Sequence, residues 1–454
     1  MPIDKSAPTL TRRRFAQLSG TAVASLAMPA AALGPNIKLE IAPYTVEASP
    51  KHRFRTLAYN GQVPGPLLRM TQGESQTVEV HNLSKDPEVV HWHGLFLPSE
   101  IDGAMEEGTP MIAPGASASY TFRPDPPGFR WFHTHTFAGK NLTKAQYGGQ
   151  HGFLLVEPRD NPARYDREVF LALHDWGGHF LSSDDGYMNP VYDVSTINGK
   201  MLGFGEPVRV KQNERVLMHL LNSSPTEIHW VALAGHSFQV VALDGNTVPQ
   251  PQTVSMLRIA PAERVSAIVE MNKPGVWVLG DVRKHVQAAG MGIVVEYSGA
   301  TGKPTWNQPE ELVWNYPQFA ASTSLATNAL DAIRIDLVFD SKFQGHGNEE
   351  LWRINGKTYP HTDEPALKLG QRYRLILNNK SMDHHPLHLQ RHTFEGRRID
   401  GSAELQGLRK DVVLVRAGTT AEVEFVANNP GRTLFHCHQQ DHMDRGFMMV
   451  FRYE

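Results

Sequence analysis

The sequence predicts an all-β protein made of three consecutive β-sandwich or β-barrel domains. Short segments of alternating apolar and polar residues are separated by glycine and proline, and long stretches with helical periodicity are scarce. The chain has 454 residues, which at about 150 residues per domain suits three domains. One sequence pattern also recurs three times, which indicates three copies of one domain.

The first 34 residues predict an export signal rather than a part of this fold. Arginines at 12–14 precede Phe15, a mildly apolar run covers residues 18–33, and small residues occupy 30–32. The paired arginines resemble the twin-arginine type of signal, whose substrates cross the membrane folded. The apolar run is too short for a comfortable membrane anchor. We therefore expect a periplasmic protein that uses the twin-arginine export machinery; a disordered tail with chance arginines is the alternative.

After residue 34, the repeat divides the chain into three predicted domains. Each copy opens on an Asn-Gly pair, reaches a histidine-containing strand, and later passes a proline before a second strand. In the outer copies this last strand carries His-X-His, at 133–135 and 436–438, whereas the middle copy has Gly-Asp-Val at 280–282. The middle domain is therefore predicted to be structural, and the outer two to share a site. The predicted domains cover residues 35–160, 161–310 and 311–454.

Composition excludes several classes of site. The 44 basic and 47 acidic residues give a net charge of −3, so the chain lacks the basic excess of a nucleic-acid-binding protein. Its one cysteine, Cys437, excludes a disulfide within the chain, a zinc ribbon and an iron–sulfur cluster. Beside this single thiol stand 22 histidines.

Six of the histidines form three pairs with the spacing of metal ligands. Because side chains alternate across a strand, His-X-His places both imidazoles on one face, two residues apart. A lone histidine is more often a core or surface residue, but three matched pairs at equivalent positions of a repeat favour a metal site. The pairs are His91 and His93, His133 and His135, and His436 and His438.

Cys437 lies between the histidines of the last pair, so on a strand its thiol points to the opposite face. One triplet of residues can thus reach two metal sites, a thiolate on one side and two imidazoles on the other. Together with His385 and His442, Cys437 supplies the two imidazoles and one thiolate typical of a blue copper site. A buried, inert cysteine is the alternative.

In order and combination, these motifs resemble those of three-domain multicopper oxidases of the bacterial laccase or copper-efflux-oxidase kind. The resemblance runs over nearly the whole chain after the signal. It rests on His-X-His-Gly at 91–94, His-X-His at 133–135, His-Pro-X-His at 385–388 and His-Cys-His-X₃-His at 436–442. It implies a Greek-key cupredoxin fold for each domain, one type 1 copper in the third domain, and a cluster of one type 2 and two type 3 coppers between the first and third.

Carried over by motif, the resemblance also implies roles for single residues. Cys437 and Asp102 are the expected catalytic residues, since Asp102 resembles the family's acidic residue beside the cluster; a turn-forming Asp-Gly is the alternative reading. Phe447 holds the axial position of the type 1 site and offers no donor, unless a bulge brings in Met448. The implied ligands are His385, Cys437 and His442 for type 1 copper, His91 and His388 for type 2, and His93, His133, His135, His436 and His438 for the type 3 pair.

The sequence departs from the family pattern at Gln390. The third motif normally continues to a further histidine, a type 3 ligand, and the internal repeat places Gln390 over His93. His392 shares the strand face but lies about 6.6 Å along the strand, and His236 holds the equivalent place in the middle copy, so His392 is predicted to be scaffold. A carboxamide is a weak donor for copper. We therefore expect one type 3 copper to be under-coordinated, a deficit that histidine at position 390 would correct.

The predicted function is that of an exported, laccase-like oxidase. It would oxidise phenols or other one-electron donors, metal ions among them, and reduce dioxygen to water. One alternative is an electron-transfer or copper-binding protein whose cluster is impaired by Gln390. Another is a copper-free structural relative, which should have lost several ligands, the cysteine included.

Overall fold

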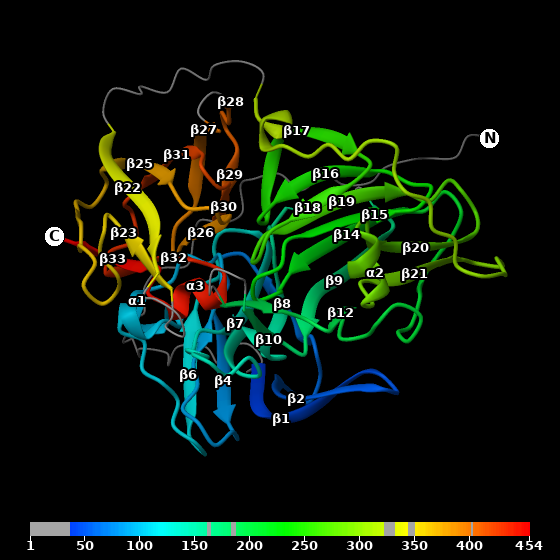
Figure 1. Ribbon diagram of the computed structural model, residues 1–454, viewed down its shortest axis with the longest axis horizontal. Coiled ribbons are helices and arrows are strands. Elements are labelled where there is room, and N and C mark those ends of the chain that lie inside the picture. The colour runs from blue at the N-terminus through cyan, green and yellow to red at the C-terminus, as the bar shows by residue number, and fades with distance from the viewer. Residues whose placement is uncertain (1–36, 161–164, 183–187, 322–331, 344–349, 401–402) are drawn as a thin grey trace, which may run out of the picture.

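The computed structural model describes residues 37–160, 165–182, 188–321, 332–343, 350–400 and 403–454. The export signal predicted over residues 1–34 lies outside these ranges. The described chain is built almost wholly of strands, so the predicted all-β class is confirmed (Figure 1). None of its helices is long and apolar enough to cross a membrane.

Two four-stranded sheets form the first domain, in blue and cyan in Figure 1. Their facing apolar side chains make one core, which includes Leu39, Val80, Trp92 and Phe132. Three short helices lie among the strands: α1 (Ser99–Asp102), η1 (Met105–Glu107) and η2 (Ala145–Tyr147). One sheet has the order β2 (His52–Tyr59), β1 (Ile37–Ser49), β4 (Gln76–Asn82), β6 (Ser117–Phe122), and the other β3 (Gly65–Thr71), β8 (His151–Glu157), β7 (Gly128–Thr134), β5 (Val90–His91).

The middle domain, in green, packs a six-stranded sheet on a five-stranded one. The hairpin of β10 (His179–Ser182) and β11 (Met188–Val191) and the helix α2 (Lys284–Ala288) lie outside these sheets. The larger sheet has the order β12 (Val194–Ile197), β9 (Arg167–Trp176), β14 (Arg215–Asn222), β19 (Arg264–Glu270), β16 (Phe238–Leu243), β17 (Asn246–Val254). The smaller has β13 (Val208–Val210), β21 (Gly292–Tyr297), β20 (Val276–Asp281), β15 (His229–Leu233), β18 (Leu257–Ile259).

The third domain, in yellow to red, repeats this design with a seven-stranded and a five-stranded sheet. Helix α3 (Gln440–Asp444) follows the last strand of the histidine motif. The larger sheet has β23 (Leu351–Ile354), β22 (Ile333–Lys342), β25 (Arg372–Asn379), β31 (Thr420–Val426), β27 (Phe394–Ile399), β28 (Ala403–Glu404), with β29 (Arg409–Lys410) on β27. The smaller has β24 (Ala366–Leu367), β33 (Met448–Tyr453), β32 (Arg432–Cys437), β26 (His385–Leu389), β30 (Val412–Val415).

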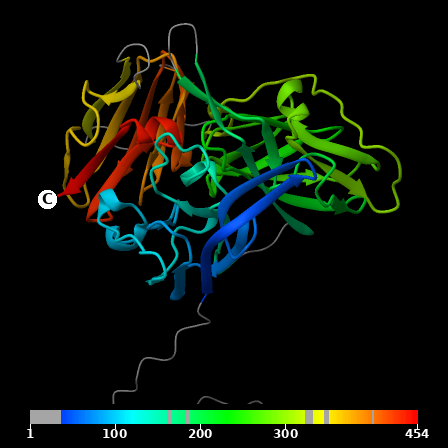
Figure 2. The ribbon, with the colours of Figure 1, turned by 60° about the horizontal axis from the view of Figure 1, so that its bottom comes forward.

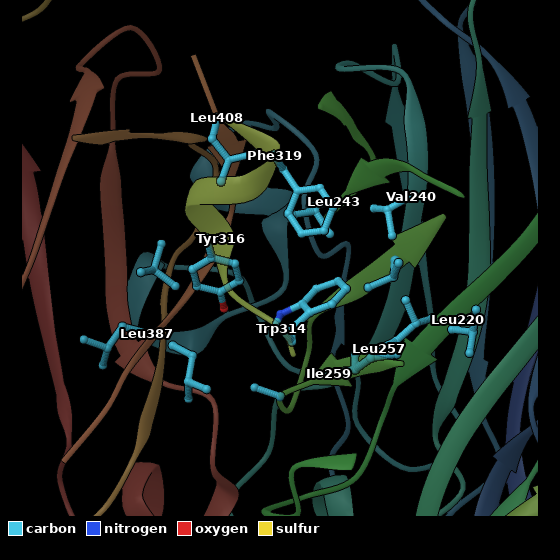
Figure 3. Packing of buried hydrophobic residues seen from close by; sticks show 14 of the residues in the cluster. Leu220, Val240, Leu243, Leu257, Ile259, Trp314, Tyr316, Phe319, Leu387 and Leu408 are labelled. Atoms are coloured by element: carbon cyan, nitrogen blue, oxygen red, sulfur yellow. The ribbon is translucent and has the colours of Figure 1, made fainter. Parts of the chain in front are cut away.

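Each domain contacts the other two, as Figures 1 and 2 show from two sides. The segment that links the middle and third domains ends in η3 (Tyr316–Phe319) and packs between them (Figure 3). Its buried Trp314 and Phe319 belong to one continuous cluster with Leu243 of the middle domain and Leu408 of the third. The two domains therefore share a core rather than a hinge.

The internal repeat is exact in strand register. Val90 pairs with Thr134 in the first domain, Val231 with Asp281 in the second, and Leu387 with Cys437 in the third. Two residues before the first partner of each pair stand Glu88, His229 and His385. The three domains thus present the same pair of positions, and only the third fills it with histidine and cysteine.

In the middle domain this position holds an ion pair in place of ligands for a metal. His229 Nε2 lies 2.8 Å from Asp175 Oδ2, and His229 Nδ1 lies 3.3 Å from Asp281 Oδ2. Burial alone would lower the pKa of His229, but the carboxylates of Asp175 and Asp281 outweigh it and raise this pKa to about 9. A buried histidine between two carboxylates is thus held in its charged form.

This ion pair predicts a stability that falls at alkaline pH. Because the folded-state pKa of His229 is above the ordinary value, its contribution is complete below about pH 6.5 and is lost as pH rises through about 9. A shift of this size is worth roughly 3 kcal/mol. We expect His229→Gln to be less stable than the wild type at pH 6, with the gap in melting temperature closing by pH 10. The exposed His285→Gln is the control, and a gap that stays constant with pH would contradict the assignment.

Candidate metal centre

Histidines from the first and third domains meet at the interface of these domains. His91 at the end of β5 pairs with His133 of β7, and His388 of β26 pairs with His436 of β32. Each domain therefore presents its histidines from two hydrogen-bonded strands, which fixes them in register. All eight predicted cluster histidines are at most 1% exposed: His91, His93, His133, His135, His388, His436, His438 and, on the opposite face of β26, His385 of the neighbouring group completes the buried set.

Donor atoms converge in three groups, within each of which they lie no more than 4.8 Å apart. Two groups belong to the interface and share His93, while the third lies inside the third domain. The groups are His91, His93 and His388; His93, His133 and His438; and His385, Cys437 and His442. The structure thus brings together eight of the ten predicted ligands in these groups, and places the remaining two, His135 and His436, against each other with 3.5 Å between their Nε2 atoms.

The interface histidines are prepared to bind a metal. His91, His133 and His388 each donate Nδ1–H to a backbone carbonyl, at 2.9, 2.7 and 2.7 Å. Their Nε2 atoms are buried and have no hydrogen-bond partner. Leaving such a nitrogen bare is unfavourable unless something else binds it. A ring that donates one N–H to the protein and directs its other nitrogen into a cluster is the usual arrangement of a metal-bound histidine, so these residues fit a metal centre.

Burial also keeps these imidazoles neutral, which is the form that binds metals. Desolvation, helped by neighbouring histidines, lowers the pKa of His133 and His438 well below the ordinary value. Desolvation likewise lowers the pKa of His135 and His388 to about 3. The set therefore stays unprotonated at any pH at which the protein would work.

The third group has the donors of a blue copper site. Cys437 Sγ lies 3.8 Å from His385 Nδ1 and 3.5 Å from His442 Nδ1, and the two nitrogens are 3.1 Å apart. Burial raises the pKa of the Cys437 thiol. A thiolate at this position therefore needs a bound cation, and two imidazoles with one thiolate suit copper.

The axial side of this group is apolar. The Phe447 ring lies 4.7 Å from the His385 ring, measured between centroids, and belongs to the same buried cluster as Cys437. Met448 packs in a different cluster, with Leu434 and Met443, so its thioether does not face the group. His442 is 6% exposed, whereas His385 and Cys437 are fully buried.

The two residues singled out beside the cluster lie where the sequence predicted. Asp102 is fully buried, and its Oδ2 lies 3.2 Å from His91 Nδ1. Gln390 is fully buried next to His135. His392 donates to or accepts from Gln390 O and Tyr453 Oη, at 3.0 and 2.7 Å, and so anchors the scaffold rather than the cluster. His236 of the middle domain contacts Ala234 O and Tyr297 Oη in the same way.

Sequence reasoning missed a buried ion pair that supports the cluster. Asp411 Oδ1 lies 3.2 Å from His93 Nε2, and Asp411 O accepts Nδ1–H of His388. Arg264, from the middle domain, donates two hydrogen bonds of 2.6 Å to the Asp411 carboxylate, and Arg130 of the first domain donates a third of 3.3 Å. The middle domain is thus more than a spacer, because it orients two cluster histidines through Asp411.

This ion pair also explains the glycine of the first motif. A side chain at Gly94 would place its Cβ 2.7 Å from Asp411 Oδ2 and 3.0 Å from Arg264 Nη2. Gly94 also has a φ of +86°, which favours glycine. The only early signal for this contact was that glycine, since Asp411 and Arg264 lie outside every histidine motif.

Removing Arg264 should therefore weaken both the fold and the metal site. Arg264→Met leaves Asp411 buried without its main partner, for which a loss of about 3–5 kcal/mol is expected. We also expect less copper to be retained, because His93 and His388 lose their orientation. Arg258→Met, half-buried in the same domain and stacked on Tyr316, is the control. Unfolding curves and copper analysis of both variants check this, and wild-type values for Arg264→Met would refute it.

Comparison with known proteins identifies the family. Three family profiles described as multicopper oxidase match residues 40–161, 169–298 and 336–454. The multicopper oxidase MmcO of Mycobacterium tuberculosis is 30% identical over 429 residues, which cover 86% of this chain and 82% of that protein. Laccase-15 of Oryza sativa is 25% identical, over 96% of this chain and 92% of that protein.

Solved structures agree with the fold. The multicopper oxidase from Pseudomonas thermotolerans matches 92% of this chain and 99% of its own, with a TM-score of 0.73 and 25% identity. Fet3p, a multicopper oxidase that functions in iron import, matches 92% of this chain and 90% of its own, with a TM-score of 0.80 and 20% identity. The buried histidine groups, the His-Cys-His triplet and these matches lead to one conclusion: the chain belongs to the multicopper oxidases, copper-dependent oxidoreductases with type 1, type 2 and type 3 copper centres and oxygen as acceptor.

Proposed function

We propose that this protein is an exported laccase-like oxidase, which takes single electrons from phenolic or similar donors and reduces dioxygen to water. The observation that carries the proposal is the triplet His436-Cys437-His438. Its cysteine belongs to the His₂Cys group, and its two histidines face the interface groups on the other side of β32. Two kinds of metal site are thereby joined by a few covalent bonds of one strand.

We assign the copper ligands as the motifs predict, because the donor groups fit them. Bound copper would supply one-electron chemistry at the first site and the reduction of dioxygen at the others. The assignment is type 1 copper to His385, Cys437 and His442, type 2 copper to His91 and His388, and the type 3 pair to His93, His133, His135, His436 and His438.

The protein's own groups have separate tasks in this reaction. Reduction to water consumes protons, and the buried Asp102 carboxylate beside His91 is suited to hold one close to the cluster. His442 is the most exposed member of its group and ends at the surface, so a donor that docks there would need no passage through the core. The predicted export through residues 1–34 is part of the proposal and is tested by fractionating cells that express the full chain.

The choice of donor rests on weaker support. Relatives over most of the chain include proteins named laccase, from Oryza sativa and Phlebia radiata, which favours phenols. A metal ion remains an alternative donor, since Fet3p is described as functioning in iron import. The 15 methionines are scattered along the chain and form no insert that would gather cuprous ions.

Oxygen consumption by the copper-loaded protein tests the function. We expect blue absorption, and oxygen uptake that is faster with a phenol than with ferrous or cuprous ions. Cys437→Ser should lose both signals, to the level of the metal-free protein, because it removes the thiolate of the type 1 site. Blue absorption without uptake from any donor would favour the electron-transfer alternative, which Gln390 makes the strongest competitor. A protein that stays colourless after copper loading would refute both.

A further inference from the structure

Gln390 stands where the third ligand of the second type 3 position would be. It follows β26 directly, its backbone N–H donates to Leu434 O of β32 at 3.0 Å, and its side chain is fully buried. One end of its amide lies 3.0 Å from His135 Nε2, and this nitrogen lies 3.5 Å from His436 Nε2. The amide therefore lines the pocket into which His135 and His436 point.

Two carboxyl groups decide which end of the amide faces this pocket. On the side away from His135, the amide lies 2.9 Å from Asp102 Oδ2 and 3.1 Å from Glu107 Oε1. Glu107 Oε1 already accepts the N–H of Leu434, at 2.7 Å. An amide oxygen at this point would face two acceptors, whereas the amide nitrogen has one N–H for each. The nitrogen must face the carboxyl groups, so Oε1 faces His135 and the pocket.

This arrangement is rigid and fully desolvated. Gln390 and Asp102 are 0% exposed and Glu107 is 2% exposed. Glu107 comes from η1 of the first domain, and its bond to Leu434 ties η1 to β32, the strand of the His-Cys-His triplet. A buried polar group is tolerated when its hydrogen bonds are satisfied. The amide meets this condition at its nitrogen, and its oxygen is left to bind whatever occupies the pocket.

We propose that Gln390 is a metal ligand through its carboxamide oxygen, and that Glu107, with Asp102, positions it. The second type 3 copper would then have two imidazole nitrogens and one oxygen, while the first has three imidazoles from His93, His133 and His438. Donors bound at about 2.0–2.1 Å lie about 2.9–3.6 Å apart at angles of 90–120°. The observed separations of 3.0 and 3.5 Å fall in this range. The proposal rests on the assigned oxidase function.

The two type 3 positions should consequently differ in affinity. A neutral oxygen donor suits copper less well than imidazole does. The copper held by His135, His436 and Gln390 is therefore the one that a chelator removes first. The site is expected to be filled nonetheless, because all three donors are already in place before a metal arrives.

Copper stoichiometry and electron paramagnetic resonance test the ligand. Gln390→Leu removes the oxygen and keeps the side chain's bulk. We expect this variant to bind one copper fewer than the wild type, with its blue absorption unchanged. The type 3 copper that remains would lose its spin-coupled neighbour and add a new Cu(II) signal. A purely structural role for Gln390 would lower the melting temperature of the metal-free protein without producing that signal.

Glu107 is tested by a matched set of variants. Glu107→Leu removes the acceptor that fixes the amide, and we expect partial loss of the same copper with the same new signal. Glu107→Gln retains an acceptor oxygen and should restore most of it. Glu106→Leu is the control, since Glu106 is also buried in η1 but has no contact with Gln390. If Glu107→Leu does not fold, Gln390→Leu and Glu107→Gln still decide the question.

The outcomes separate this proposal from the function on which it rests. Full copper and an unchanged resonance spectrum in Gln390→Leu would overturn the ligand. A wild-type protein that lacks one copper but shows blue absorption would also overturn it, and would support the electron-transfer alternative. A wild-type protein with no blue absorption at all would overturn the oxidase function and this inference together.

Discussion

The metal centre depends on one buried ion pair, Arg264 with Asp411. It is the point at which all three domains meet: Asp411 comes from the third domain, Arg264 from the middle one, and Arg130 from the first. Buried charges of this kind are stable only while both partners remain. Because the same carboxylate contacts His93 and its backbone accepts from His388, the relative placement of the domains and the aim of the cluster histidines are one problem with one solution.

The three domains also show how one pocket can be used in three ways. The first position of the pocket decides the outcome. Glu88 accepts hydrogen bonds from Thr134 and Gln150, and burial raises its pKa to about 6. His229 forms ion pairs, and His385 faces a thiol. Strand register is the same in all three, so the scaffold does not dictate the chemistry. What changes is whether the charges inside the pocket already balance without a metal.

Much of this could be predicted from sequence, for a physical reason. Alternation along a strand fixes which face His436 and Cys437 take, so a local motif already separates two metal sites. The repeat supplied the number of domains in the same way. The contacts of Asp411 with Arg264 could not be predicted, because the two residues are 147 positions apart and neither belongs to a motif. Glu107 was missed for the same reason: its partner Gln390 belongs to another domain.

The substitution of glutamine for histidine is less drastic than composition suggests. A ligand histidine has an acceptor nitrogen toward the metal and an N–H on its far side, which the protein holds with a carboxyl or carbonyl group. Gln390 has the same polarity, with an oxygen toward the pocket and a nitrogen toward Asp102 and Glu107. Its amide has two far-side N–H groups where imidazole has one, and two carboxyl oxygens receive them. The surroundings of Gln390 are therefore those of a ligand, and its second carboxyl is what a carboxamide requires and an imidazole would not.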